Sequence, residues 1–281
     1  VCVRPATGAR RGRRGLLFEW CADMVAPAVL PTTSSFPPDS RRLRWWPWAL
    51  LVALLLAAVR AAGLWGGRAW APLLPLGFLV MTLLPWWWLD AGQRAEMGWR
   101  RAPGWRVYLK AAALGLGLSL AVFLVFLAFF GMGPDHAYVT VAETFRRQVP
   151  AGLGLPALFA MFTLPAMIFS PLGEEVFFRG LLPWTLSARF GKRWATVLEC
   201  AMFGTVHLLH HGLIFHAATG ELTLRPLSGG LWVICMMGVA WMFSRVRQRG
   251  GSLFPAMLCH AAFNLGMAAC VFLEVWPRLP Q

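Results

Sequence analysis

Long apolar runs alternate with short segments rich in arginine, glycine and proline, and this pattern extends over most of the chain. A helix that crosses the hydrocarbon core of a bilayer needs about 20 predominantly apolar residues. Runs that approach this length lie at residues 45–64, 70–89, 107–132, 153–188, 194–215, 231–243 with its flanks, and 253–275. The pattern therefore predicts an all-α fold, a polytopic membrane bundle of about seven to eight transmembrane helices.

The run at 153–188 is too long for a single upright span. It contains Pro156, Pro165 and Pro171. Because proline removes a helical hydrogen bond and clashes with the preceding turn, we expect these residues to divide the run into a re-entrant piece and a helix. The re-entrant piece would be an eighth membrane element.

The chain divides into three parts by composition. Residues 1–44 are basic and rich in proline and serine, and we expect this segment to be disordered or, in part, a misassigned start. Met24 follows 23 Arg-rich residues that lack the apolar core of a signal peptide. Residues 45–132 hold the N-terminal transmembrane helices. Residues 153–275 form a second membrane domain, which carries most of the polar residues found inside apolar runs.

The composition agrees with a membrane protein. Hydrophobic residues make up 58% of the chain and charged residues 14%, whereas a soluble domain has about 25% charged residues. The 16 tryptophans suit the interface between lipid and water, where indole rings concentrate. The six cysteines lack the paired spacing of a metal or redox motif, and we interpret them as small buried hydrophobic residues.

The net charge of +14 would suit nucleic-acid binding, but the distribution of the basic residues argues against it. These residues cluster at the ends of the apolar runs, where they orient helices in the membrane. If the N-terminus is cytoplasmic and the runs alternate, 19 of the 26 lysines and arginines lie on the inner side and five on the outer side. We therefore expect an integral protein of a bacterial plasma membrane with a cytoplasmic N-terminus and no nucleic-acid partner.

Ionisable and amide side chains are costly inside a bilayer and usually mark function there. Three apolar runs of the second half carry residues that could form a functional site, and within each run two of these residues are spaced by one helical turn. They are Glu174, Glu175 and Arg179; Phe203 and His207; and His260 and Asn264. At the helical rise, Glu174, His207 and Asn264 each lie about 21–22 Å from the nearest inner basic residue. We therefore expect one site near the middle of the membrane.

The spacing within each run suggests a chemical role. Glu175 and Arg179 are four residues apart and can form an ion pair on one helix face, which leaves Glu174 free to act as general base or acid. His260 and Asn264, also four apart, offer two hydrogen-bond donors for an oxyanion. The alternatives are a buried ion-pair network for the carboxylates and interhelical hydrogen bonds for the histidines and the asparagine.

His207 follows Phe203 by one helical turn, so the aromatic ring can form one wall of a polar pocket. His207 and His211 share a helix face and would suit zinc. However, His210 and His211 lie closer to the outer interface, and we interpret those two as partners in interhelical hydrogen bonds. Because no serine lies in a G-x-S-x-G turn, the remaining glutamate and histidine favour direct hydrolysis of an acyl bond by water.

Taken in order, the patterns EExxxR, FxxxH and HxxxN resemble those of the CPBP family of intramembrane endopeptidases, which comprises CAAX prenyl protease 2, lysostaphin resistance protein A-like and Abi proteins. The resemblance covers residues 153–275, and the first half matches only in being hydrophobic. It implies an endopeptidase in the lipid bilayer that cuts a membrane-associated protein or peptide, CAAX-like or anchored by its C-terminus. The implied roles are water activation by Glu174 and His207, oxyanion binding by His260 and Asn264, and support by Glu175, Arg179 and Phe203.

The same resemblance leaves two types of peptidase open: a metalloendopeptidase and a glutamate-type enzyme without a metal. If a divalent metal such as zinc is the cofactor, its ligands would be Glu174, His207 and His260. Asn264 is a poor ligand for zinc, so the sequence fits a glutamate-type mechanism without a metal better.

Two other classes of function remain open. An ion-coupled transporter would place the same buried charges along an ion path, but its expected mark is paired repeats with broken helices in both halves. The apolar runs before residue 133 contain no carboxylate or histidine, and we find no internal repeat. A non-catalytic membrane scaffold or immunity protein would keep its phenotype after the loss of Glu174 and His207, which distinguishes it from an enzyme.

Overall fold

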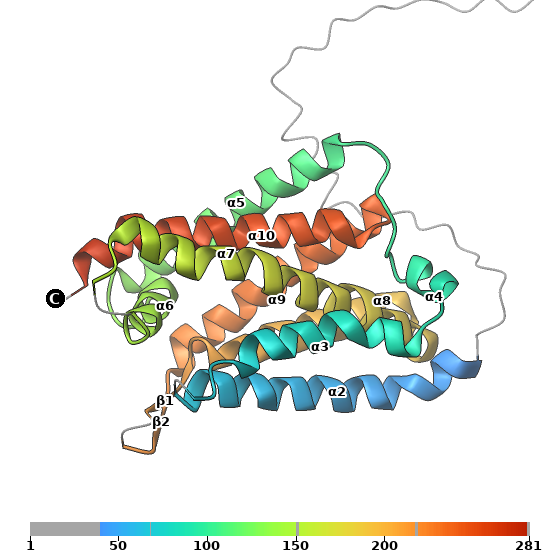
Figure 1. Ribbon diagram of the computed structural model, residues 1–281, viewed down its shortest axis with the longest axis horizontal. Helices are drawn as coiled ribbons and strands as arrows, with labels where there is room; N and C mark the ends of the chain where they lie inside the picture. Colours follow the sequence, from blue (N-terminus) through green and yellow to red (C-terminus); the bar gives the residue numbers. More distant parts are fainter. Residues whose placement is uncertain (1–39, 68, 150–151, 217–218, 280–281) are drawn as a thin grey trace, which may run out of the picture. The chain divides into compact units, whose positions relative to one another are not determined.

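The structure is a computed structural model that describes residues 40–67, 69–149, 152–216 and 219–279. Most of the basic segment predicted at residues 1–44 therefore lies outside the described residues. The described part is built almost entirely from helices, with one short hairpin (Figure 1).

The α-helices are α2 (Ser40–Trp65), α3 (Leu73–Trp88), α4 (Ala91–Glu96), α5 (Arg106–Phe130), α6 (Ala137–Arg146), α7 (Leu155–Glu174), α8 (Leu182–Val206), α9 (Pro226–Gly250) and α10 (Leu253–Cys270). Shorter π or 3₁₀ segments extend or join some of them: η1 (Glu175–Leu181), η2 (His207–Leu209), η3 (Val271–Val275) and η4 (Trp276–Arg278). Strands β1 (Leu213–His216) and β2 (Glu221–Leu224) pair antiparallel, with Leu213 opposite Leu224.

By length and composition, five helical segments of the described residues can cross a membrane: Arg44–Trp65, Arg106–Phe130, Leu155–Leu209, Pro226–Gly250 and Leu253–Arg278. Helix α3 is apolar but shorter. Large apolar side chains on these helices point outward, and more than half of the surface is exposed for Leu54, Phe129, Ile168 and Ile234. Such a surface suits lipid rather than water. The predicted all-α membrane bundle is confirmed, and the number of crossings stays a prediction.

The prolines of the run at 153–188 do not divide it, so the predicted re-entrant piece was wrong. Pro156 lies in the first turn of α7, where a backbone N–H would have no partner within the helix. Proline therefore costs no hydrogen bond at this position. Pro165 and Pro171 lie inside α7, which continues to Glu174 and passes directly into η1 and α8. Contacts of α7 with α3 and α10 outweigh the local preference of proline for a break.

The long helical segment instead turns back at Gly191, which has φ 75° and ψ 161°. Glycine adopts this left-handed region without the steric cost that a Cβ atom brings. The part of α8 after Gly191 returns along η1: the ring centroids of Phe178 and Phe203 are 5.3 Å apart, and Arg179 Nε lies 3.8 Å from Glu199 Oε2. This reversal carries the end of α8 back towards the junction of α7 and η1.

Helix α4, helix α6 and the hairpin were not predicted. Helix α6 lies between two apolar runs, yet its residues Tyr138 and Ala142 are fully buried. The hairpin of β1 and β2 begins inside the run predicted as a helix at 194–215, whose helical part ends at Leu209. Apolar residues of a four-residue strand cannot be distinguished from a continued helix by their pattern alone.

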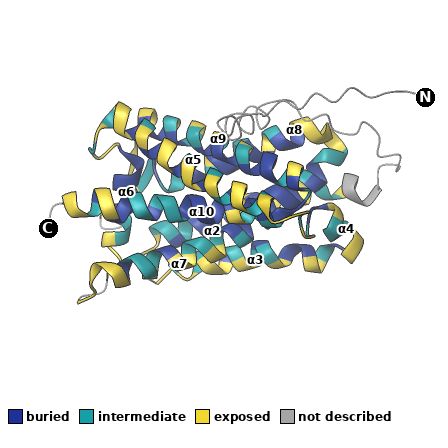
Figure 2. Ribbon diagram, turned by 90° about the horizontal axis from the view of Figure 1, so that it is seen from above, coloured by how far each residue is buried: buried dark blue, intermediate teal, exposed yellow. Residues whose placement is uncertain are grey.

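Buried residues concentrate on the inward sides of α8, α9 and α10, whereas exposed residues follow the outer sides of α3, α5 and α7 (Figure 2). Helix α10 packs along α5. Their backbones approach closely at Gly115, where an added Cβ atom would lie 2.0 Å from the carbonyl oxygen of Cys259. Small residues at a membrane-helix interface allow this close packing, which favours van der Waals contact and interhelical polar contacts.

We expect Gly115→Ala to destabilise the protein by about 1–3 kcal/mol, because the new methyl group forces α5 and α10 apart. Gly117 on the same helix is the matched control, since a Cβ atom there has no neighbour within 4 Å. Gly117→Ala should be neutral or stabilising by up to about 1 kcal/mol, the helix propensity difference. Thermal unfolding of the purified variants in detergent measures both, and equal unfolding temperatures would contradict the close packing.

Candidate active site

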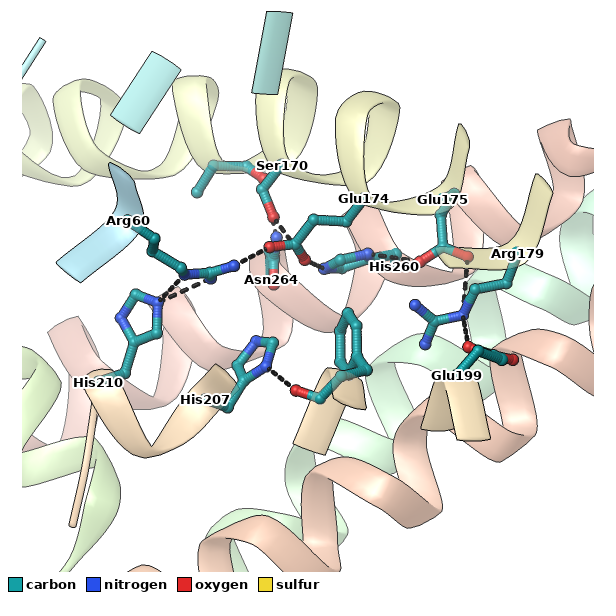
Figure 3. A network of polar contacts seen from close by, with 12 residues as sticks. Arg60, Ser170, Glu174, Glu175, Arg179, Glu199, His207, His210, His260 and Asn264 are labelled. Atoms are coloured by element: carbon teal, nitrogen blue, oxygen red, sulfur yellow. Dashed lines mark hydrogen bonds and ion pairs between the residues drawn. The ribbon is translucent and has the colours of Figure 1, made fainter. Parts of the chain in front are cut away.

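The residues of the three motifs meet in the interior, although they come from separate helices (Figure 3). Glu174 ends α7, and Glu175 and Arg179 belong to η1. His207 begins η2, directly after α8, while His260 and Asn264 lie on α10. All six are buried, as is Phe203. The predicted convergence of these residues at one place is what the structure shows.

The π geometry of η1 has a local cause in Pro183. Proline cannot donate the helical hydrogen bond to the carbonyl group of Arg179, and its ring would clash with that carbonyl group. The preceding turn widens, and the N–H of Leu182 bonds to the carbonyl oxygen of Phe177, five residues back. Single π turns inside α-helices are frequent at functional sites. Here the wide turn carries Glu175 and Arg179.

His260 links the two adjacent carboxylates. Its Nδ1 lies 2.9 Å from Glu175 Oε1, and its Nε2 lies 3.7 Å from Glu174 Oε2. Because a carboxylate oxygen accepts, Nδ1 carries a hydrogen and donates to Glu175. The imidazole ring also stacks on Phe243, with ring centroids 4.9 Å apart. These contacts fix the ring so that Nε2 faces Glu174.

Glu174 is not free of ion pairs, and that prediction was wrong. Its Oε1 pairs with Arg60 Nη1 of α2, and its Oε2 accepts from Ser170 Oγ at 3.4 Å. A fully buried carboxylate needs such partners, because an unpaired charge at this depth is strongly unfavourable. The signal in the sequence was Arg60 itself, the single charged residue of the run at 45–64.

His207 presents a nitrogen that can accept a proton. Its Nδ1 lies 2.7 Å from the carbonyl oxygen of Phe203. Since a carbonyl oxygen only accepts, Nδ1 carries the hydrogen and the neutral ring leaves Nε2 as an acceptor. The Phe203 ring packs 4.4 Å from the His207 ring and forms the predicted aromatic wall. Figure 3 shows His207 pointing towards Glu174 from the opposite side of the cluster.

Asn264 already uses part of its donor capacity. Its Nδ2 donates to the carbonyl oxygen of Ala166 on α7 at 2.8 Å. An amide nitrogen has two hydrogens, so this bond leaves one for another acceptor. The contact joins α10 to α7 one turn before Ser170.

Arg179 lies between two carboxylates, of which the sequence analysis named one. Its Nε is 3.4 Å from Glu175 Oε2 and 3.8 Å from Glu199 Oε2. The guanidinium carbon lies 4.1 Å from the centroid of the Phe203 ring, which adds a cation–π contact. Glu199 was missed, although its spacing from Phe203 and His207 is four and eight residues, which marks one face of α8.

His210 and His211 make hydrogen bonds between elements, as predicted. His210 Nε2 accepts from Arg60 Nε at 2.9 Å and from Nη2 at 2.7 Å. His211 Nδ1 lies 2.8 Å from Thr140 Oγ1, away from Glu174. Burial lowers the pKa of His211 to about 4, so this ring is neutral at neutral pH.

The donor set does not fit a metal ion. Within residues 40–67, 69–149, 152–216 and 219–279, no three His, Cys, Asp or Glu side chains are grouped so that they could hold one. Of the three candidate ligands, Glu174 is engaged by the permanent charge of Arg60. A catalytic zinc site needs three converging protein ligands and an open position.

Comparison with known proteins identifies one family. Residues 156–266 match the family described as type II CAAX prenyl endopeptidase Rce1-like. The matched segment contains all three motifs and the described helices from α7 to most of α10. No curated protein and no solved structure matches the chain.

We expect Arg179→Met to destabilise the protein by about 3–5 kcal/mol, because it leaves Glu175 and Glu199 buried without their shared cation. Arg193→Met on α8 is the control, since Arg193 is exposed and such surface changes usually stay within about 0.5 kcal/mol. Thermal unfolding in detergent compares the two. An Arg179→Met variant as stable as Arg193→Met would show that Arg179 does not hold the cluster together.

Proposed function

Because residues 156–266 match the family described as type II CAAX prenyl endopeptidase Rce1-like, we propose that this chain is an intramembrane endopeptidase of glutamate type. Its substrate is a membrane-associated protein or peptide, CAAX-like or anchored by its C-terminus. The observation that carries the proposal is the position of His260, which joins Glu174 and Glu175 inside an apolar bundle. Carboxylate, histidine and amide groups at one buried site suit the hydrolysis of a peptide bond.

Glu174 and His207 activate the attacking water. Glu174 Oε2 or His207 Nε2 takes a proton from the water while its oxygen bonds to the carbonyl carbon of the substrate. When the tetrahedral intermediate collapses, the bond between carbon and nitrogen breaks and the proton passes to the departing amine. Such proton transfer by a positioned side chain contributes about 10²–10⁴-fold to the rate.

His260 and Asn264 bind the oxygen that becomes negative, His260 as an imidazolium ion whose Nδ1 donates to Glu175 and whose Nε2 carries the second hydrogen for the oxyanion. Asn264 has one amide hydrogen left after its bond to Ala166, and His260 Nε2 faces the same space as Glu174. Glu175 holds His260 through Nδ1, and Arg179 in turn holds Glu175. Donors held in advance of the reaction stabilise the developing charge without further reorganisation. No step of this mechanism passes through a metal ion.

We expect Glu174→Gln to lower cleavage by about 10²–10⁴-fold, because glutamine cannot accept the proton. The control is Glu221→Gln, which changes an exposed carboxylate on β2. Membrane proteins of the producing cell would be compared by their C-termini, at matched expression of wild type and both variants. C-termini that vanish only with Glu174→Gln identify the substrate.

If the three profiles coincide while deletion of the gene still has a phenotype, the proposal is wrong. A scaffold or an ion-coupled transporter then accounts for the phenotype. Proton flux into liposomes that contain the purified protein separates these two alternatives.

We also expect cleavage of the identified substrate to be unchanged by EDTA or phenanthroline, because Glu174 is paired with Arg60 and no three ligands among the described residues are grouped to hold a metal. The measurement is the initial rate before and after dialysis against each chelator. A loss of activity that zinc restores would show a metalloendopeptidase and overturn the glutamate-type proposal.

A further inference from the structure

Arg60 reaches the candidate active site from α2, far outside the matched segment 156–266. Its side chain is 92% buried. It forms an ion pair with Glu174 through Nη1, and its Nε and Nη2 both donate to His210 Nε2 (Figure 3). An arginine inside a membrane helix is energetically unfavourable, so it needs an anionic partner that stabilises its charge.

Arg60 and Arg179 serve different carboxylates. Arg179 lies beside Glu175 and Glu199, on the side of His260 away from Arg60. In the part of the chain that the structure describes, Arg60 is the one arginine or lysine that forms an ion pair with Glu174. Loss of Arg60 would therefore leave the Glu174 charge without a cationic partner at hydrogen-bond distance.

The contacts of Glu174 are divided between its two oxygens. Arg60 occupies Oε1, whereas Ser170 Oγ and His260 Nε2 approach Oε2 at 3.4 and 3.7 Å. The planar guanidinium group is itself held at its other edge by His210. This arrangement leaves Oε2 with only the longer contacts. Oε2 lies next to His260, and there it can accept a proton from the attacking water.

We propose that Arg60 is a positioning residue of this centre: it compensates the charge of Glu174 and fixes Oε1, so that Oε2 faces the attacking water. The inference rests on the proposed function. Helix α2 then completes the catalytic unit, although the family match does not extend to it. Arg60 touches no reacting atom, so it acts through Glu174.

The kinetic test compares Arg60→Met and Arg60→Lys, with Arg44→Met at the exposed start of α2 as the control. On the substrate identified by C-terminal comparison, Arg60→Met should lower kcat at least about tenfold and leave KM within about twofold, since the loss acts on the reacting geometry. Arg60→Lys keeps the charge but not the planar fork that contacts both Glu174 and His210, so it should recover only part of kcat. Wild-type kcat for Arg60→Met, or a change in KM alone, would overturn the inference.

A second measurement does not depend on activity. The unfolding temperatures of Arg60→Met, Glu174→Gln and the double variant form a cycle. Each single variant should unfold at a lower temperature, because it leaves one buried charge unpaired, and the double variant should recover much of the loss. Additive losses would show that the two residues do not interact, and would overturn the inference.

The two measurements separate this inference from the proposed function. If wild type cleaves nothing, the proposed function fails, and the cycle alone then decides whether Arg60 and Glu174 are coupled. If Glu174→Gln abolishes cleavage but Arg60→Met retains wild-type kcat, the proposed function stands and the positioning role of Arg60 is overturned.

Discussion

The requirement that buried carboxylates be paired determines how this bundle is assembled. One connected group of buried charges contains three carboxylates and two guanidinium groups: Glu174, Glu175, Glu199, Arg60 and Arg179. Their contacts form a row in which carboxylates alternate with cations or with the His260 ring. Because each charge is tolerated only beside its partner, helices α2, α8 and α10 must all take their places around α7 and η1.

Two backbone features bring these partners together. The reversal at Gly191 returns α8 along η1, so that Glu199 meets Arg179 and His207 faces the junction of α7 and η1. The wide turn ahead of Pro183 sets the positions of Glu175 and Arg179. Gly191 and Pro183 have no functional group themselves, yet both fix where the functional groups lie. A bundle of straight, independent spans would leave the same side chains apart.

The apolar runs and the seven motif residues could be predicted because intramembrane polar groups are too costly to be frequent without a reason. The partners Arg60 and Glu199 could not be assigned in the same way. Residues 60 and 174 are 114 positions apart, and a hydrophobicity pattern does not say which helices are neighbours. The prolines of α7 misled the prediction for a related reason, since contacts with α3 and α10 decide whether the helix breaks. The hairpin was missed because β1 continues the apolar run of the preceding helix.

The row of charges also bears on which part of the chain constitutes the functional unit. Residues 156–266 supply Glu174, Glu175, Arg179 and Glu199, with one cation for three carboxylates. As an imidazolium ion the His260 ring adds a second positive charge beside Glu174 and Glu175, but an imidazole ring, unlike a guanidinium group, also exists in a neutral form. Arginine remains charged at every relevant pH. The permanent charge of Arg60 therefore makes α2 part of the electrostatic framework in which Glu174 lies, rather than an accessory helix.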